Sequence, residues 1–176
     1  MKRLWFTLFL YVGCQSEASF ISSGVSWELA QNRKASISDI RYQLSFDIPK
    51  NKIKPITVEE SIHFKLLDLT NPVILDFRQP ADYIHSVIVK GKSVSYKLEN
   101  DHILIDASYF SEGENTIFIS FRAGDMSLNR NDDYLYTLFV PDRASTAIPC
   151  FDQPNLKGRY SLTLSCLLYT SDAADE

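Results

Sequence analysis

The sequence has 176 residues, of which 45% are apolar, 12% aromatic and 23% charged. This composition is typical of one ordinary folded domain and argues against a chain that is disordered throughout. Lysine and arginine number 18 against 22 aspartate and glutamate, so the net charge is −4, which disfavours a nucleic-acid binder that relies on neutralising phosphates. Three cysteines are too few for a disulfide scaffold.

The first residues have the pattern of a secretory signal. Lys2 and Arg3 precede a mostly apolar run over residues 4–13, which is too short to span a bilayer as a permanent helix. A buried first strand or helix is the alternative, but the polar residues that follow directly favour a signal. We therefore expect the protein to be exported.

Two cleavage sites compete at the end of this signal. Val12-Gly13-Cys14 resembles a bacterial lipobox, which would end the signal at residue 13 and make Cys14 the lipidated amino terminus. Ser16-Glu17-Ala18 offers the small-x-small cut of ordinary signal peptidase, which would end it at residue 18. We expect a periplasmic or outer-membrane lipoprotein, attached to the membrane through a lipid on Cys14, or a secreted protein.

The last residues, 166–176, follow a strand-like run over 159–164 and show no alternation of their own. They resemble the conceptual translation of a transposase-end adaptor used in shotgun sequencing libraries, so we expect that they do not belong to the natural protein. A short acidic helical tail is the alternative. The expected folded domain is 19–165.

The body of the chain has a period of two, which indicates β-strands. Apolar residues alternate with polar ones over 40–48, a turn follows over 49–54, and the pattern resumes over 56–66, with Glu60 as its one polar residue on the inward side. We expect these two long strands to form an antiparallel pair. Shorter alternating runs follow at 73–77, 87–89, 94–98, 102–105 and 117–121.

This pattern predicts an all-β fold of roughly nine strands, a multi-stranded antiparallel sandwich or layered sheet. Only residues 23–33 favour a turn or two of helix before the first strand. Parallel α/β nucleotide-binding folds are disfavoured, because glycine-rich phosphate loops are absent from the sequence as well.

No residues of the sequence form a recognisable catalytic metal site. His63, His85 and His102 lie 22 and 17 positions apart, so no pair has the i, i+4 spacing of H-E-x-x-H. The acidic run that contains Asp125, Asp132 and Asp133 lacks the ordered spacing of a calcium loop, and a solvated loop explains it better. We expect no catalytic and no metal-binding residue in this chain.

Cys150 lies in a loop bracketed by Pro149 and Pro154, which restrict the backbone at both ends. A reactive cysteine would need a nearby base and a positive potential. Its apolar neighbours favour a small buried residue instead, with Asp152 bonding to backbone groups of the loop.

The residues of this loop carry a resemblance to a known family. Pro149, Cys150, Phe151, Asp152, Gln153, Pro154 and Lys157 resemble the P-C-F-D-E-P-x-x-K signature of the zinc aminopeptidases of the aminopeptidase N family. Gln153 alone departs, since glutamate is usual there. We call residues 149–157 the signature loop. The order of the surrounding strands over residues 25–165 also resembles the amino-terminal domain of that family.

The resemblance implies a saddle-like, all-β amino-terminal domain that docks on a thermolysin-like catalytic domain. In the family, zinc is bound there by H-E-x-x-H and a downstream glutamate, and a G-x-M-E-N segment binds the free amine of the peptide substrate. None of these motifs occurs in this sequence. The chain alone is therefore expected to be inactive and to bind no cofactor, while the complete enzyme would hold zinc in a catalytic domain that this chain lacks.

Family members often carry a glutamine or glutamate before the signature loop that grips the substrate's amino terminus. Leu138 and Val140 occupy the matching positions here, so that role is not carried over. Asp142 is the nearest acid, and a turn after Pro141 explains it.

Two functions remain open. The first is the amino-terminal fragment of an exported zinc aminopeptidase, which removes amino-terminal residues from peptides. The second is a stand-alone surface β-sandwich that binds a glycan or a protein, with Tyr83, Tyr96, Tyr109 and Tyr134 as candidate sugar-stacking residues, although core packing explains such tyrosines more simply.

Overall fold

The computed structural model describes residues 21–131 and 134–166. Cys14 with the expected signal, Asp132 and Asp133 of the acidic run, and residues 167–176 lie outside the described residues. Residue 166 is described and is the last residue of a strand.

One helix, α1 (Trp27–Ser36), precedes the first strand. It begins at Ser26, whose Oγ accepts a hydrogen bond from the backbone N–H of Leu29 at 3.1 Å, as an N-cap residue does. The helix is longer than the turn or two expected over 23–33. Its buried residues are Leu29, Arg33 and Ser36, a face with a single apolar side chain, so hydrophobic periodicity does not reveal its length.

Eleven strands follow within the described residues. They are β1 (Ile37–Ile48), β2 (Thr57–Leu66), β3 (Val73–Asp76), β4 (Ile84–Val89), β5 (Lys92–Ser93), β6 (Tyr96–Glu99), β7 (His102–Ile105), β8 (Gly113–Arg122), β9 (Leu128–Arg130), β10 (Leu135–Thr137) and β11 (Arg159–Cys166). Three short 3₁₀ turns, Ala81–Tyr83, Ala107–Tyr109 and Ala144–Thr146, lie between strands.

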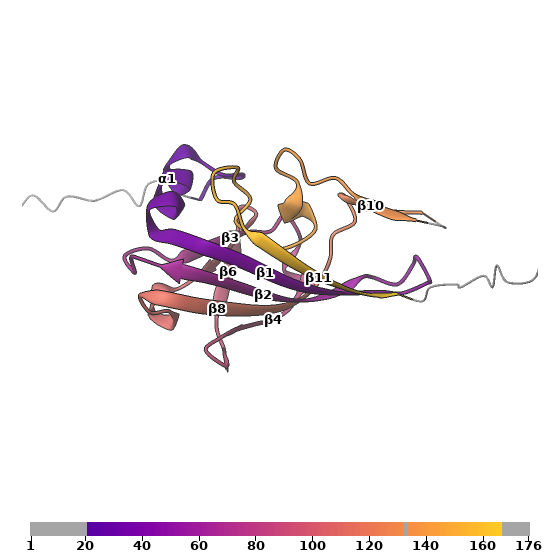
Figure 1. Ribbon diagram of the computed structural model, residues 1–176, viewed down its shortest axis with the longest axis horizontal. Helices are drawn as coiled ribbons and strands as arrows, with labels where there is room; N and C mark the ends of the chain where they lie inside the picture. Colours follow the sequence, from indigo (N-terminus) through magenta and orange to yellow (C-terminus); the bar gives the residue numbers. More distant parts are fainter. Residues whose placement is uncertain (1–20, 132–133, 167–176) are drawn as a thin grey trace, which may run out of the picture.

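The strands form three sheets: a main sheet in the order β11-β1-β2-β8-β4-β5, a three-stranded sheet β3-β7-β6, and the pair β10-β9 (Figure 1). β1 and β2 pair antiparallel, with Tyr42 opposite Ile62, which confirms the expected pair. The expected all-β fold is likewise confirmed. β11 pairs with β1 in parallel, a pairing that alternation within each strand does not reveal.

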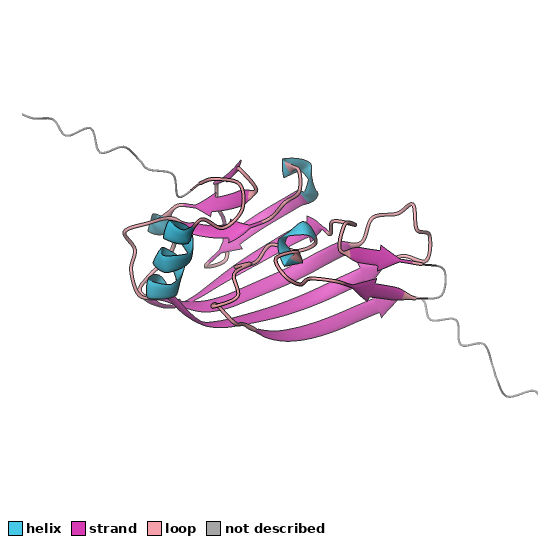
Figure 2. Ribbon diagram, turned by 90° about the horizontal axis from the view of Figure 1, so that it is seen from above, coloured by secondary structure: helices cyan, strands magenta, loops and turns pink. Residues whose placement is uncertain are grey.

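The core lies on one face of the main sheet. Figure 2 shows this sheet curving along one side of the molecule, with α1 and the smaller sheets on its other side. Phe64 and Phe121 from the main sheet are fully buried, and they meet Phe151 and Phe77 edge-on at centroid distances of 5.8 and 5.6 Å. Such edge-to-face aromatic contacts add to the stabilisation that burial provides.

None of the helices in the described ranges is long and apolar enough to cross a bilayer.

Candidate functional site

The signature loop is held against the edge of β3. Cys150 and Asp76 form an isolated antiparallel bridge, in which the N–H of Asp76 donates to the carbonyl of Cys150 at 2.7 Å and the N–H of Cys150 donates back at 3.0 Å. Cys150 and Phe151 are buried. The loop thus pairs with the edge of the three-stranded sheet, although the loop and β3 lie far apart in the sequence.

The carboxylate of Asp76 is the centre of the contacts beneath this loop. Arg33 donates to both of its oxygens, at 2.8 and 2.7 Å, in the bidentate geometry that guanidinium and carboxylate favour. The backbone N–H of Asp152 donates to Oδ2 at 2.8 Å. Burial acts to raise the pKa of Asp76, but the hydrogen bond from His102 and the charge of Arg33 outweigh it and lower the pKa, so this acid is ionised.

His102 completes the group and is fully buried. Its Nδ1 lies 2.8 Å from Oδ1 of Asp76, and its Nε2 lies 2.9 Å from the carbonyl oxygen of Ser22 and 3.1 Å from that of Gly24. An ionised carboxylate and two carbonyls only accept hydrogen bonds, so both ring nitrogens must carry a proton. Burial acts to lower the pKa of His102, but these hydrogen bonds raise it overall, and the ring is an imidazolium cation.

Gln153 reaches the same group from the loop. Its Nε2 donates to the carbonyl of Ala30 at 3.1 Å and to Oδ1 of Asn155 at 2.7 Å, and its Oε1 accepts from Arg33 at 3.5 Å. A glutamate at this position would have no N–H to donate. The glutamine that departs from the family signature therefore suits this site. We call Arg33, Asp76, His102 and Gln153 the buried cluster.

The remaining residues of the signature loop have structural surroundings. Asp152 accepts a hydrogen bond from the backbone N–H of Ser145 at 2.9 Å, as expected of an acid that binds loop backbone. Burial, followed by the charges of Asp152 and Asp76, raises the pKa of the Cys150 thiol, which keeps it protonated and unreactive. Pro149 is buried, whereas Pro154 and Lys157 are exposed.

β1 holds the other side of the loop through Tyr42. Its hydroxyl accepts a hydrogen bond from the backbone N–H of Phe151 at 3.1 Å. Gly158, directly after the loop, lies so close to the same ring that a Cβ there would be 2.5 Å from it, which leaves room only for glycine. The loop is thus bound by β1, β3 and α1 together.

Zinc does not fit the donors of the described residues. Both nitrogens of His102 are taken by oxygen acceptors, Nδ1 of His63 bonds to the hydroxyl of Thr116 at 2.9 Å, and His85 is exposed on β4. No group of three histidine, cysteine or acidic side chains gathers in the described ranges. The arrangement can position a loop.

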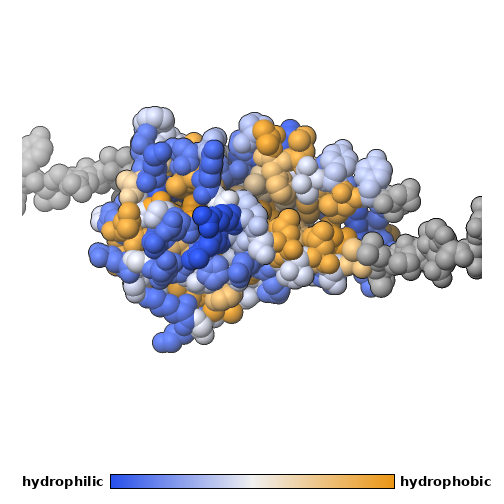
Figure 3. All heavy atoms as spheres, viewed as in Figure 1, coloured by the Kyte–Doolittle hydropathy of each residue, from blue (hydrophilic) through white to orange (hydrophobic). Residues whose placement is uncertain are grey.

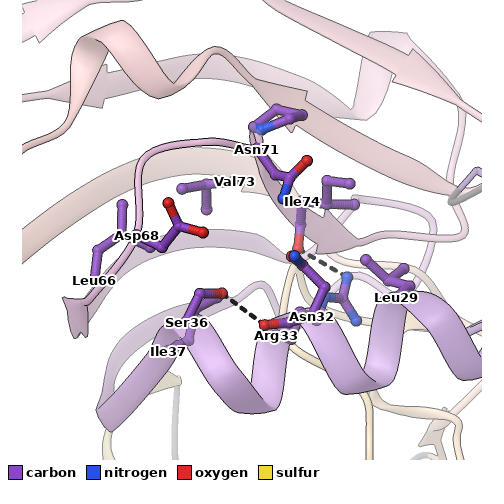
Figure 4. Close-up of a pocket in the computed structure, with 11 residues that line it drawn as sticks. Leu29, Asn32, Arg33, Ser36, Ile37, Leu66, Asp68, Asn71, Val73 and Ile74 are labelled. Atoms are coloured by element: carbon purple, nitrogen blue, oxygen red, sulfur yellow. Dashed lines mark hydrogen bonds between the residues drawn. The ribbon is translucent and has the colours of Figure 1, made fainter. Parts of the chain in front are cut away.

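Of two hollows in the described surface, one is too small to hold a ligand and the other is lined by residues outside the buried cluster. The first, bordered by α1 and the segment before β3, has a volume of about 10 Å³ (Figure 4), room for one water at most. Arg33 donates to the carbonyl of Ile74 at its edge, at 2.8 Å. The second has a volume of about 300 Å³ and lies on the outer face of the main sheet. Polar side chains such as Glu59 form most of its lining, and the apolar ring of Phe118 lines it as well.

The four tyrosines considered for sugar stacking have different surroundings. Tyr83, Tyr96 and Tyr109 are partly buried and pack against the core, and Arg122 covers the ring of Tyr83 at 3.6 Å. Tyr134 alone is largely exposed, and it stacks on Tyr136 with centroids 6.2 Å apart. Most of this group therefore serves packing.

Sequence reasoning missed Arg33 and the central role of Asp76. Asp76 interrupts the apolar run Val73-Ile74-Leu75-Asp76-Phe77, and an acid within a buried run needs a cationic or hydrogen-bonding partner. That signal points to the acid, but nothing in the sequence identifies a partner 43 positions away.

The fold is similar to solved structures of metallopeptidases. Leukotriene A4 hydrolase from Saccharomyces cerevisiae matches at 15% identity and a TM-score of 0.61, over 76% of this chain and 24% of that one. The M1 zinc metallopeptidase from Deinococcus radiodurans matches at 13% and 0.55, over 74% and 32%. Aminopeptidase A from Legionella pneumophila matches at 16% and 0.62, over 73% and 16%.

These likenesses concern the fold, because all three identities are low. The chain spans between 16% and 32% of the length of these three proteins. Its sequence matches no family model and no curated protein. What the chain shares with the M1 zinc metallopeptidases is thus the all-β fold expected of the amino-terminal domain of the aminopeptidase N family.

Proposed function

We propose that this chain is the amino-terminal domain of an exported zinc aminopeptidase of the aminopeptidase N family. One observation carries the proposal: the loop whose residues resemble the family signature is bound to a buried cluster, in a chain with the corresponding fold. Cys150, Asp152 and Gln153 make the contacts that bind the loop to β3 and α1. A loop so firmly held presents one fixed shape to whatever packs on it.

In the complete enzyme this domain would form one wall of the cleft in which a peptide's amino-terminal residue is removed. Its partner would be the enzyme's own catalytic domain, which would bind zinc and polarise the attacking water. The described residues do not fit zinc, so no step of the reaction is assigned to this chain. Its contribution is a rigid surface beside the cleft.

The segment that leads into the signature loop is the surface proposed to face the catalytic domain. Leu138 and Val140 are 51% and 76% exposed there, next to Tyr136 on β10. Exposed apolar groups gathered on one segment indicate an interaction surface. An apolar pair also has no charge with which to hold a substrate's ammonium group, so the amine would have to be bound by the catalytic domain.

Export, with a lipid on Cys14, is part of the proposal and is supported by the sequence pattern over residues 1–14 alone. Mass spectrometry of the protein from its native membrane tests it. A mature amino terminus at Cys14 carrying a diacylglyceryl mass supports lipidation. An unmodified terminus after residue 18 would support ordinary secretion instead.

Sequencing the gene past codon 165 tests the proposal as a whole. The expected result is a strand that continues in frame, followed by several hundred codons that encode H-E-x-x-H and a downstream glutamate. A natural stop codon directly after Glu176 would contradict both the missing catalytic domain and the adaptor origin of residues 166–176.

The alternative is a stand-alone surface module that binds a glycan or a protein. The hollow of about 300 Å³ on the outer face of the main sheet supports it, because Phe118, 46% exposed, lies there among hydroxyl and amide side chains. Aromatic stacking with hydrogen bonds at its rim is how a sugar would be held. A natural stop after Glu176 together with saturable oligosaccharide binding would favour this alternative.

A further inference from the structure

We propose that the imidazolium of His102 binds residues 21–24, the segment that precedes α1, and releases them when it loses its proton. The inference goes beyond the proposed function and does not depend on it. His102 is the first residue of β7, directly after the turn that joins β6 to β7. This turn and the ring of His102 together hold the segment, which we call the amino-terminal segment.

Two exposed hydrogen bonds connect the amino-terminal segment to the turn. Asn100 and Asp101 form the turn with positive φ angles of 47° and 70°, the backbone of a tight hairpin. Nδ2 of Asn100 donates to the carbonyl of Ile21 at 2.7 Å, and Oγ of Ser23 donates to Oδ2 of Asp101 at 2.8 Å. Because both bonds are exposed to water, each contributes only modestly to holding the segment.

The contact with His102 lies deeper. Nε2 of this buried ring lies 2.9 Å from the carbonyl oxygen of Ser22 and 3.1 Å from that of Gly24. Gly24 has a φ of 78°, a conformation that favours glycine, and the bend brings both carbonyls to one nitrogen. One charged donor thus serves two acceptors of the segment, and hydrogen bonds from charged donors are the stronger ones.

Other contacts contribute little to holding the segment. Among the described residues, no backbone-to-backbone hydrogen bond connects residues 21–24 to the rest of the chain. The side chains of Ser22 and Ser23 are exposed, and that of Ile21 is half-buried. Figure 3 shows a mainly hydrophilic surface where α1 lies, so a broad apolar contact does not anchor the segment there. Its position therefore depends mainly on His102.

Charged groups approach the ring of His102 from the elements around it. Asp76 on β3 and the exposed Glu99 on β6 pair with His102 in the sheet. Arg33 from α1 binds the carboxylate of Asp76, and the signature loop adds the backbone N–H of Asp152 to that carboxylate. The negative charge nearest to the ring is thus that of Asp76, at Nδ1.

Loss of one proton reverses the contact with the segment. The bond between Nδ1 and the ionised Asp76 is charge-assisted, so a neutral ring keeps its remaining proton on Nδ1. Nε2 then presents a lone pair to the carbonyl oxygens of Ser22 and Gly24, which cannot donate a hydrogen bond. Three buried or half-buried acceptors without a donor repel one another, and release of the segment lets water satisfy them.

Release should occur as the pH rises. Burial acts to lower the pKa of His102, but the hydrogen bonds to Asp76 and Ser22 raise it overall in the folded protein. The segment is therefore bound below about pH 6.5, the ordinary value for histidine, and is released as the pH rises through the raised value. In a lipoprotein attached at Cys14, release would add up to about 14 Å of extended chain between the membrane and α1.

A spin label on the segment measures this release in the full chain. Ser22→Cys provides an exposed attachment site and keeps the backbone carbonyl, in a background of Cys14→Ser and Cys166→Ser, while Cys150 is buried and does not react. Electron paramagnetic resonance then reports the mobility of the label from about pH 5 to 9. We expect an immobilised label at low pH. The ratio of mobile to immobile label should rise by roughly tenfold or more at high pH, since a hydrogen bond from a charged donor contributes about that much.

His102→Gln tests whether this ring is the group that titrates. It removes the titrating group, so the mobility of the label should no longer depend on pH over this range. His85→Gln, at an exposed position on β4, is the matched control and should leave the transition in place. A label attached instead through Ser45→Cys, exposed on β1, should keep the same mobility throughout, which separates local release from unfolding.

An NMR titration of the His102 ring in the unlabelled chain gives a second measurement that needs no substitution of His102. Its midpoint should coincide with that of the label's release. A label at residue 22 whose mobility is the same at every pH would overturn the proposal, as would a transition that His102→Gln leaves in place or two clearly separate midpoints. A label at residue 45 that becomes mobile at the same pH would overturn it too, because the whole fold would then be unfolding.

Discussion

Nδ1 of His102 lies 2.8 Å from Oδ1 of Asp76, with both side chains buried. The same carboxylate binds Arg33 from α1 and the backbone of Asp152 from the signature loop. One ionised acid thus connects β3, β7, α1 and the loop. Because its partners carry two positive charges, removing the acid should affect all four elements at once.

Asp76→Asn should lower the free energy of unfolding by about 3–5 kcal/mol, since two buried cations would lose their counter-charge. Urea unfolding followed by circular dichroism measures the change. Asp47→Asn removes a similar charge from an exposed position on β1 and should cost less than about 0.5 kcal/mol. Equal effects of the two substitutions would show that the buried cluster contributes little.

His102 should make stability decline with rising pH. Its pKa is raised in the folded state, so its contribution is complete below the unfolded value of about 6.5 and is lost as the pH rises through the folded value. His102→Gln should flatten this decline in unfolding free energies measured from about pH 5 to 9. His85→Gln, at an exposed position, should leave it intact. An unchanged slope in His102→Gln would contradict the assignment of an imidazolium.

Gln153→Glu should raise the pKa of His102 further, because a carboxylate near Arg33 adds negative charge to a cluster with two cations and one anion. An NMR titration of the His102 ring protons measures it. Gln153→Met removes the same amide hydrogen bonds without adding charge, and it should cost about 1–2 kcal/mol without raising that pKa. If both variants shift the pKa alike, charge is not the cause.

Glu60→Leu should stabilise the fold by about 1–3 kcal/mol. Glu60 is 2% exposed on the core face of β2, both of its carboxyl oxygens lack a hydrogen-bond partner among the described residues, and burial raises its pKa. That raised pKa adds a loss of stability as the pH rises above the unfolded value of about 4.3. Glu60→Gln should remove this loss while keeping a buried polar group, so thermal unfolding of both variants separates the two effects.

Alternation identified the longer strands because burial of one sheet face acts on every second residue, as from Tyr42 to Phe46 in β1. It identified Glu60 as an inward polar residue for the same reason. It did not identify β9 and β10, because three residues are too few to show a period. The buried cluster could not be predicted, because Arg33 and His102 lie 43 and 26 positions from Asp76 in the sequence. The pattern of a single strand carries no information on contacts between residues so far apart. The parallel register of β11 on β1 was hidden for that reason too.

The resemblance of the signature loop pointed to a fold that the structure has, but it did not explain Gln153. The contacts to Ala30 and Asn155 explain it, and they depend on the position of α1. A substitution within a motif is thus understood only when the elements packed on the motif are known.

Under the proposed function, this chain supplies a structural wall and no catalytic chemistry. The direct test is hydrolysis of aminoacyl arylamides by the purified chain, with zinc added and again with a chelator. We predict no hydrolysis above the protein-free rate under either condition. Robust turnover that zinc restores and the chelator removes would contradict the claim.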